Sequence, residues 1–361
     1  MRQSPSGAPA RRNVVAHVLH QLRSPYYRYR NARYLHGVRV AVAMLFSIAL
    51  TSGLGIPHGF WASVTLLVVI GGLQHHGNIR RKAAERAMAT AIGAALGLAL
   101  IGQHSVIGSM ALTYLLVSVL AGVCAYFAIG KGGYIALLTA ITLSIVAGHG
   151  DNSIDIGLWR AFNVAIGTVI ALVFSFGFPL YATYDWRYRL AENLRECARL
   201  YPWVMIGQPM SAQEQVTQFA RLSGRLVGLR SLIAPAAKEM HVPVARLEEI
   251  QRLHRSIISA LEMLAVAAVD RDAKLDWGDT YSVLIARRST IRRQLLATGR
   301  ALRSGDVTRL ERMVARQAAT GAGPAPDQSL AYELQGSYWL AQRLSEQVER
   351  MLHEVATLPL K

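Results

Sequence analysis

The pattern of apolar and polar positions divides the chain into two parts. In the first part, six apolar runs are separated by short polar or glycine-rich breaks, at about residues 38–56, 60–74, 86–103, 106–129, 133–149 and 157–181. The longer runs are close to the length of about 20 residues that an α-helix needs to cross the hydrocarbon core of a bilayer. The pattern therefore predicts six transmembrane helices.

The second and fifth runs are shorter than the others, and each follows a glycine-rich segment. GLGIPHG precedes the second run, and GKGG precedes the fifth. Short apolar segments interrupted by Gly or Pro at corresponding places in two halves are typical of transporter helices that are broken or that begin inside the membrane. We expect the second and fifth helices to be of this kind.

After Tyr181 the pattern becomes that of amphipathic helices in a water-soluble domain. Leu, Ala, Val and Met recur at steps of three and four between Arg, Glu and Gln, as in RLEEIQRLHRSIISALEMLAV, which is the period of a helix with one apolar face. Ser211 and Glu214 have the spacing of a capping box. Helix breaks are predicted at Pro243, Gly278, Gly305 and the GAGPAPD stretch at 321–327. We predict five or six helices here.

Lysine and arginine in the short flanking segments indicate the orientation in the membrane. Basic residues lie in the N-terminal segment, after the second run and after the fourth run, at Arg2, Arg11, Arg12, Arg23, Arg28, Arg30, Arg33, Arg80, Arg81, Lys82 and Lys131. The intervening loops TSGLGIPHG, GQHSV and GHGDNSID contain none. Because basic loops remain in the cytoplasm, both termini are predicted to be cytoplasmic in an inner (plasma) membrane protein.

The apolar part contains an internal repeat with an offset of 74 residues. Residues 59–93 align without a gap on residues 133–167 with ten identities in 35 positions, beginning with GFWASVT and GYIALLT. A duplicated unit of three helices explains this pattern. Because the number of helices per unit is odd, the second unit must be inserted upside down relative to the first.

These observations predict an all-α, polytopic membrane protein with six transmembrane helices arranged as a 3+3 inverted repeat, followed by a cytoplasmic helical domain. The predicted domains are a basic cytoplasmic N-terminal segment at 1–36, a transmembrane domain at 37–181 with repeats at about 37–104 and 105–181, and the helical domain at 182–361.

The repeat places two arginines, Arg86 and Arg160, at equivalent positions that enter the third and sixth helices from opposite sides. One interpretation is that both reach the lipid head groups or pair locally, Arg86 with Glu85 and Arg160 with Asp155. The other is that both line a path for anions, since a guanidinium stays charged and binds a carboxylate through two parallel hydrogen bonds. Their symmetric recurrence in a region with few acids favours the anion path.

Small and hydroxylated residues near the arginines also recur in the two halves. Small residues at GxxxG spacing allow helices to approach closely, and this interpretation applies to Gly93, Gly97, Gly167 and Ala171. Thr65 and Thr139 lie on the two short helices. Their hydroxyls either bond to their own backbone or help to line the path.

Composition agrees with a membrane protein and excludes several other classes. Of the 361 residues, 52% are hydrophobic and 17% are charged. The net charge of +17 arises partly from the flanking basic residues, so it favours membrane orientation over nucleic-acid binding. The spacing of Cys124 and Cys197 fits neither a disulfide nor a metal site. We find no HEXXH, GxSxG or P-loop motif, so we expect no enzyme, metal or cofactor.

The phrase GFWASVT followed by RRKAAERAMATAIGAALG, and GYIALLT followed by WRAFNVAIGTVIA, resembles the fusaric acid resistance (FUSC) family of aromatic acid exporters over about residues 35–181. It is also similar to the plant aluminium-activated malate transporters. The resemblance implies efflux of organic anions, aromatic or other carboxylic acids, by an inner-membrane homodimer that contacts membrane lipid. Bacterial exporters of this group can also work with a separate periplasmic adaptor subunit.

In the plant relatives, arginines at the starts of the third and sixth helices face the anion pore, and Arg86 and Arg160 occupy the matching positions. Thr65, Thr139 and Trp61 are then candidates for further substrate contacts. The second phrase has Ile135 where the first has Trp61, so an aromatic contact from Trp61 is not duplicated.

Three mechanisms are open at this point. Proton-coupled transport needs a titratable relay, for which the candidates are Glu85, Asp151, Asp155 and His149. The scarcity of acids in the apolar part also permits channel-like passage without ion coupling. Alternatively, the protein is a membrane-anchored scaffold or sensor that acts through its cytoplasmic helices.

Overall fold

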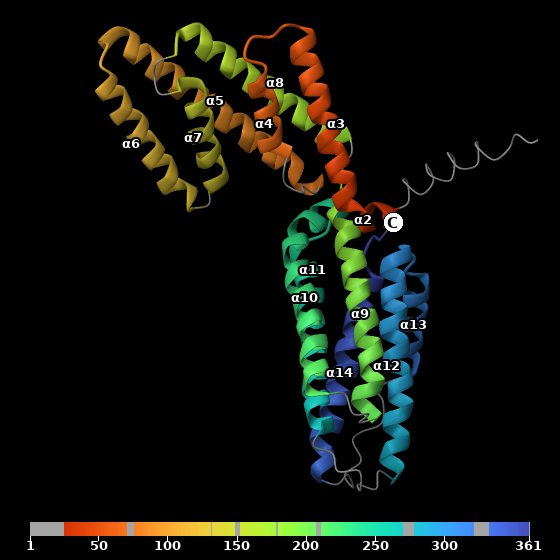
Figure 1. The fold of residues 1–361 in the computed structure, drawn as a ribbon. Coiled ribbons are helices and arrows are strands. Elements are labelled where there is room, and N and C mark those ends of the chain that lie inside the picture. The colour runs from red at the N-terminus through yellow and green to blue at the C-terminus, as the bar shows by residue number, and fades with distance from the viewer. Residues whose placement is uncertain are drawn as a thin grey trace, which may run out of the picture. The chain divides into compact units, whose positions relative to one another are not determined.

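The structure is a computed structural model. It describes residues 25–70, 76–130, 132–148, 152–177, 180–206, 211–269, 278–320 and 332–360, and the elements in these ranges are α-helices. The chain forms two compact units: an apolar unit, Arg30–Leu180, and a bundle unit that combines Tyr181–Lys361 with Met1–Tyr29. We describe the helices of each unit separately (Figure 1).

The apolar unit contains the helices α3 (Ala32–Gly53), α4 (Phe60–Ile70), α5 (His76–Ile107), α6 (Met110–Ala128), α7 (Gly133–Ala147) and α8 (Ile154–Gly177). Four of them are long and apolar enough to cross a membrane: α3, the Ala84–Ile107 part of α5, α6 and α8. The other two, α4 and α7, are apolar but have only 11 and 15 residues. The prediction that the second and fifth helices are short is confirmed.

Two helices of the apolar unit begin earlier than the hydrophobic pattern indicated. Helix α3 starts at Ala32, inside the segment 1–36 that was predicted to be a basic tail, and α5 starts at His76, ten residues before its apolar run. In both cases the added turns are basic, because Arg33 lies in α3 and the RRK sequence at 80–82 lies in α5. Arginine and lysine are good helix formers, so polar turns can extend an apolar helix.

The helices of the apolar unit pack across its two halves. The short helix α4 lies against α8, and the short helix α7 lies against α5, so each short helix contacts the last helix of the other half (Figure 1). Helix α3 packs on α4 as α6 packs on α7, and α5 contacts α8. Exchange of the two halves maps these pairs onto one another, whereas the packing of α7 on α8 has no α4–α5 counterpart of similar extent among the described residues.

The bundle unit contains the short helix α2 (Pro25–Arg30) and the helices α9 (Ala182–Ile206), α10 (Ala212–Met240), α11 (Val244–Val269), α12 (Gly278–Ser304), α13 (Thr308–Thr320) and α14 (Tyr332–Ala356). The predicted capping box is present, because the Ser211 hydroxyl accepts from the Glu214 backbone N–H and the Glu214 carboxylate accepts from the Ser211 N–H. Pro243 precedes α11, Gly278 begins α12, and Gly305 follows α12 with φ +79°. The predicted break at 321–327 lies outside the described residues.

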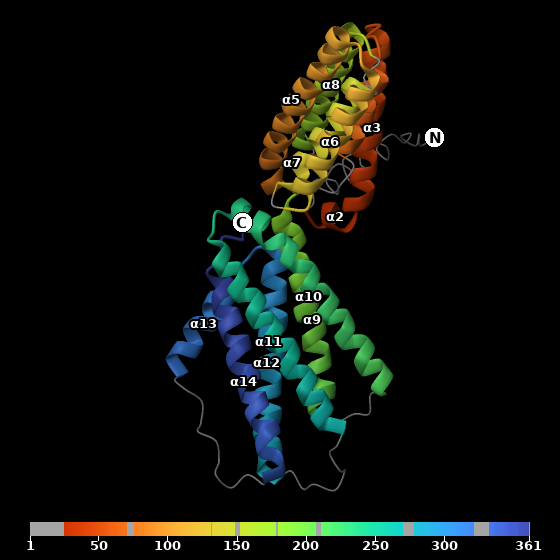
Figure 2. The ribbon, with the colours of Figure 1, turned by 90° about the vertical axis from the view of Figure 1, so that its left-hand side faces the viewer.

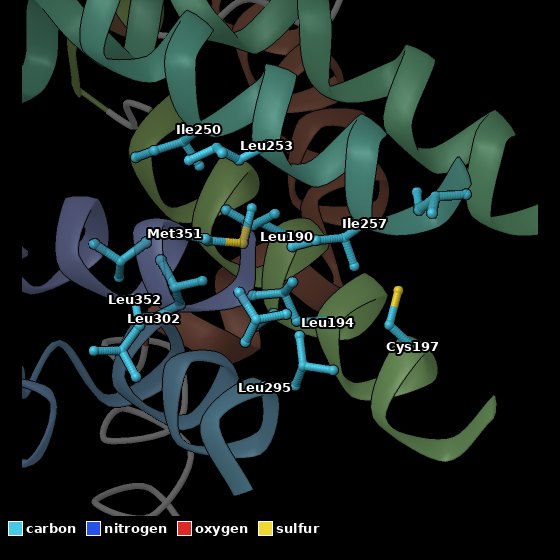
Figure 3. Close-up of a cluster of buried hydrophobic side chains, with 14 of the residues drawn as sticks. Leu190, Leu194, Cys197, Ile250, Leu253, Ile257, Leu295, Leu302, Met351 and Leu352 are labelled. Atoms are coloured by element: carbon cyan, nitrogen blue, oxygen red, sulfur yellow. The ribbon is translucent and has the colours of Figure 1, made fainter. Parts of the chain in front are cut away.

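Figure 2 shows the long helices of the bundle unit running alongside one another. Their apolar faces form a single core, in which Leu194 of α9, Ile257 of α11, Leu295 of α12 and Leu352 of α14 are all fully or almost fully buried (Figure 3). Burial of such side chains stabilises each by about 1.5–3 kcal/mol. This core explains why an apolar residue recurs every three to four positions after Tyr181.

Two polar side chains in the bundle unit, the half-buried Glu239 and the buried Arg187, contact the start of α9 and the end of α12. The Glu239 carboxylate of α10 accepts from the backbone N–H of Ala182 (3.1 Å) and of Thr183 (2.8 Å), so it caps the start of α9. Arg187 of α9 donates to the backbone oxygens of Leu302 and Leu360, at 2.8 Å each. Burial lowers the pKa of Arg187, but carbonyl oxygens at the end of α12 favour the cation.

Candidate functional site

The two arginines that the repeat relates have different surroundings, and Arg86 is the more deeply buried. Arg86 is in α5 and is 0% exposed. None of its three guanidinium nitrogens has a hydrogen-bond partner among the described residues. It therefore does not pair with the neighbouring Glu85, which is half-buried and interacts electrostatically with Tyr134 at the start of α7. The interpretation of Arg86 as a locally paired or lipid-exposed residue does not fit this environment.

Arg160 of α8 has a hydrogen-bond partner, and its side chain lies against the end of the short helix α7. Its Nη1 donates to the backbone oxygen of Ile145 in the last turn of α7, at 3.1 Å. The last carbonyl groups of a helix have no intrahelical donors and carry a partial negative charge, so an arginine is favoured there. Asn152 donates to the adjacent Val146 oxygen at 3.1 Å. Asp155 is exposed and makes no ion pair with Arg160.

Trp61 of α4 contacts Arg160 of α8. The Arg160 Cζ atom lies 5.5 Å from the centre of a Trp61 ring, which is within the range of a cation–π interaction. The contact joins the start of the first short helix to the last helix of the second half. Because Ile135 replaces Trp61 in the second phrase, the equivalent ring is absent from α7 at that position.

The two threonines of the repeated phrase are both buried but differ in bonding. Thr65 of α4 is 0% exposed, and its hydroxyl has no partner among the described residues. Thr139 of α7 is 5% exposed, and its hydroxyl donates to the Ala89 oxygen of α5 at 3.5 Å, which is a long hydrogen bond. The Thr65 hydroxyl is therefore able to donate to a ligand, whereas the Thr139 hydroxyl uses its one O–H on Ala89 and can offer a ligand its oxygen as an acceptor.

Small residues of α5 and α8 lie directly against the short helices. A Cβ atom added to Gly93 would lie 2.7 Å from the Thr139 oxygen, and one added to Gly97 would lie 2.9 Å from the Val146 side chain. At Gly167 the added atom would lie 2.2 Å from the Ala62 oxygen of α4. Ala171 is fully buried in the core between α3, α4 and α8. Helices α5 and α8 therefore approach the two short helices as closely as backbones permit.

Of the residues considered for a proton relay, the structure describes Glu85 and Asp155. His149 and Asp151 lie outside the described residues. Glu85 is half-buried near the start of α5, whereas Asp155 is exposed in the first turn of α8, and they share no contact. In the described part of the chain, no three His, Cys, Asp or Glu side chains form a group that could hold a metal ion.

Sequence reasoning missed a buried polar residue that lies one helical turn from Arg160 on α8. Asn163 of α8 is 0% exposed, and its amide nitrogen donates to the Pro57 oxygen, 106 residues away in sequence, at 2.8 Å. The signal was available, because a polar side chain stands in an apolar run where the other half has Ala89. Buried polar atoms without a partner among the described residues of this region are found on Thr65, Arg86, Thr90, Arg160 and Asn163.

Comparison with known proteins extends the similarity over nearly the whole chain. The model of the fusaric acid resistance protein family matches residues 33–359, which includes both units. The chain is also 33% identical over 235 residues to the inner membrane protein YeeA of Escherichia coli (strain K12), a match that covers 65% of this chain and 66% of that protein. The chain therefore spans just under two thirds of the length of this relative.

Proposed function

Because this chain belongs to the fusaric acid resistance protein family, we propose that this membrane protein is an inner-membrane transporter that exports organic anions, aromatic or other carboxylic acids. The observation that supports the proposal most strongly is the environment of Arg86. Moving a guanidinium from water into the protein interior without a partner costs several kcal/mol. A carboxylate substrate would supply the missing charge and up to two parallel hydrogen bonds.

The proposal assigns different tasks to the two arginines. Arg86, buried and without a partner among the described residues, is the residue that binds the anion. Arg160 donates to Ile145 and holds the end of α7. It also supplies a second positive charge, beside the aromatic surface of Trp61. Thr65 and Thr139 contribute hydroxyl groups to the path. An aromatic carboxylate fits this combination of a guanidinium, hydroxyl groups and an indole ring.

We propose that all six apolar helices cross the membrane as a 3+3 inverted repeat with both termini in the cytoplasm. Four helices are long enough to span a bilayer alone. In this proposal α4 and α7 are the helices, one in each half, that are broken or that begin inside the membrane. The correspondence of most packed pairs between the two halves and the distribution of basic residues support this arrangement. We further propose that the working unit is a homodimer with a cytoplasmic helical domain, and that it can work with a separate periplasmic adaptor subunit.

Flux through purified protein in liposomes tests the proposal. Phthalate and succinate are useful probes because both are dianions near neutral pH and cross lipid slowly, one aromatic and one aliphatic. Proteoliposomes should pass at least one of them faster than protein-free liposomes do. Absence of protein-dependent flux for aromatic and aliphatic carboxylates alike would contradict the transporter assignment.

Two further arms of the assay separate the mechanisms. A flux that rises with an imposed proton gradient indicates coupling, whereas a flux that follows only the anion gradient indicates channel-like passage. Deletion of residues 185–361 tests the scaffold alternative. If this deletion abolishes cellular activity while Arg86→Gln and Arg160→Gln leave it intact, the protein acts through its helical domain and not through an anion path.

A further inference from the structure

The turn between α3 and α4 is unusually constrained. Gly55 and His58 both have positive φ values, +60° and +57°, and a positive φ is uncommon for a residue other than glycine. Gly59 lies so close to α3 that an added Cβ atom would be 2.6 Å from the Thr51 Cβ. Such a turn persists only when its surroundings hold it in place.

Asn163 supplies one of the contacts that hold this turn. Its Nδ2 lies 2.8 Å from the Pro57 oxygen in the turn and 2.8 Å from the Trp159 oxygen in its own helix. Both neighbours are carbonyl oxygens, which only accept, so the amide nitrogen must face them and the orientation of the side chain is determined. One N–H group therefore fastens the turn to α8, and the other, bonded within α8, holds the side chain in this orientation.

The fastened turn leads directly to the aromatic ring that faces Arg160. Helix α4 begins at Phe60, three residues after Pro57, and Trp61 is its second residue. Asn163 and Arg160 are one helical turn apart on α8, and Gly167, one turn further on, contacts the Ala62 oxygen of α4. The start of α4 is thus held at Pro57 and at Ala62, with Trp61 between these contacts.

The symmetry-equivalent contact, between α5 and the start of α7, lacks both groups. Position 89 is equivalent to position 163 and is occupied by alanine, which cannot donate from its side chain. Position 135 is equivalent to Trp61 and is occupied by isoleucine. The amide and the indole therefore occur together at the contact between α8 and the start of α4, and both are absent from the equivalent contact between α5 and the start of α7, which agrees with a shared task.

We propose that Asn163 is a positioning residue that seats Trp61 against Arg160 and thereby gives the path its preference for aromatic over aliphatic carboxylates. The substrate preference in this inference rests on the proposed transport function. Its structural part, the attachment of the α3–α4 turn to α8, is independent of transport. Asn163 acts through Trp61 and need not touch the substrate.

The first test is the ratio of phthalate flux to succinate flux in proteoliposomes. Trp61→Ala should lower this ratio by about three- to tenfold, which is the range of an aromatic or cation–π contact. Asn163→Ala, and Asn163→Asp, which keeps the shape but loses the donor, should also lower it. In the Trp61→Ala background, Asn163→Ala should cause no further change. An equal fall of both fluxes, or an additive effect in the double variant, would overturn the proposal.

The second test does not depend on transport. Thr51 is 5% exposed and lies beneath Gly59. It is replaced by cysteine in a protein whose Cys124 and Cys197 are changed to alanine. The rate at which the cysteine at position 51 reacts with a maleimide is then measured. Loss of the Asn163–Pro57 hydrogen bond in Asn163→Ala should raise the labelling rate by about tenfold, because the turn opens more often. An unchanged rate would overturn the positioning role even if flux changes. If no carboxylate passes the wild-type protein, the proposed function and the specificity claim fail, while the labelling rate still decides whether Asn163 holds the turn.

Discussion

Gly167 of α8 lies against the backbone of Ala62 of α4, so that a Cβ atom at position 167 would be 2.2 Å from the Ala62 oxygen. This contact joins the last helix of one half to the short helix of the other. It also explains why the residue in this position must be glycine, since any side chain would push the two backbones apart.

Replacement of Gly167 by alanine should therefore destabilise the apolar unit. Overpacking of this kind typically costs about 1–3 kcal/mol, and here the obstacle is backbone, which cannot rotate away. Gly102→Ala in α5 is a matched control, because an added Cβ at that position would meet nothing within 4 Å. Thermal unfolding of the two purified variants in detergent compares them, and equal transition temperatures would show that α4 and α8 do not pack as described.

In the absence of substrate, replacing Arg86 or Arg160 by glutamine should shift the transition temperature in opposite directions. Arg86→Gln removes a buried charge that has no partner among the described residues, so the transition temperature should rise. Arg160→Gln removes a donor from the end of α7 and should lower it, by about 1–3 kcal/mol in stability. Differential scanning fluorimetry in carboxylate-free buffer measures both, and a loss of stability in Arg86→Gln would indicate that Arg86 is structurally bonded.

Glu239 should contribute to the stability of the bundle unit by capping α9. Replacement of Glu239 by alanine leaves the Ala182 and Thr183 N–H groups without their acceptor, at a cost of about 1–2 kcal/mol. Glu248 is exposed on α11, so Glu248→Ala serves as the control, with an expected change within about 0.5 kcal/mol. Urea unfolding followed by circular dichroism distinguishes the two. The cap assignment is wrong if both variants unfold at the same urea concentration.

His254 should make the bundle unit sensitive to acid. Burial lowers the pKa of this fully buried histidine to about 3, and its Nε2 lies 3.2 Å from the Asn193 amide nitrogen, which makes Nε2 the acceptor. Between about pH 6.5 and pH 3 the unfolded chain binds a proton that the folded chain does not, so stability falls as the pH falls through this window. From about pH 7 to pH 5 the loss from this residue is about 2 kcal/mol.

A His254→Gln variant isolates this contribution, since glutamine can accept from Asn193 but does not titrate. The stability difference between pH 7 and pH 5 should be about 2 kcal/mol smaller in the variant than in the wild type. If the wild type and the variant lose stability in parallel, His254 is not responsible for the acid sensitivity.

Local features of the fold followed from the sequence, and contacts between distant segments did not. The capping box at Ser211 and Glu214 and the short helices α4 and α7 depend on neighbouring residues, which a periodic pattern reveals. The equivalence of Arg86 and Arg160 followed from the repeat. Their different environments did not, because the Arg160 contact with Ile145 depends on how α7 ends and how α8 packs against it.

The missed residues share a physical reason. Asn163 bonds to an oxygen 106 residues away, and His254 bonds to Asn193 on another helix, so neither has a local partner that could be recognised. Both nevertheless stand on the apolar face of a helix. A polar side chain in such a position must find a partner within the fold, and this rule could have marked both positions in advance.

The central claim is that Arg86 binds the transported anion, and one flux measurement tests it most directly. Phthalate and succinate efflux from liposomes is compared for the wild type, Arg86→Gln and Arg39→Gln. Arg39→Gln is the control, because Arg39 is another buried arginine of the same unit and bonds to His36 at 2.7 Å. If Arg86 binds the carboxylate, Arg86→Gln should lower the flux of both by at least about tenfold, and Arg39→Gln should retain most of it. Equal flux in the wild type and Arg86→Gln would contradict the claim.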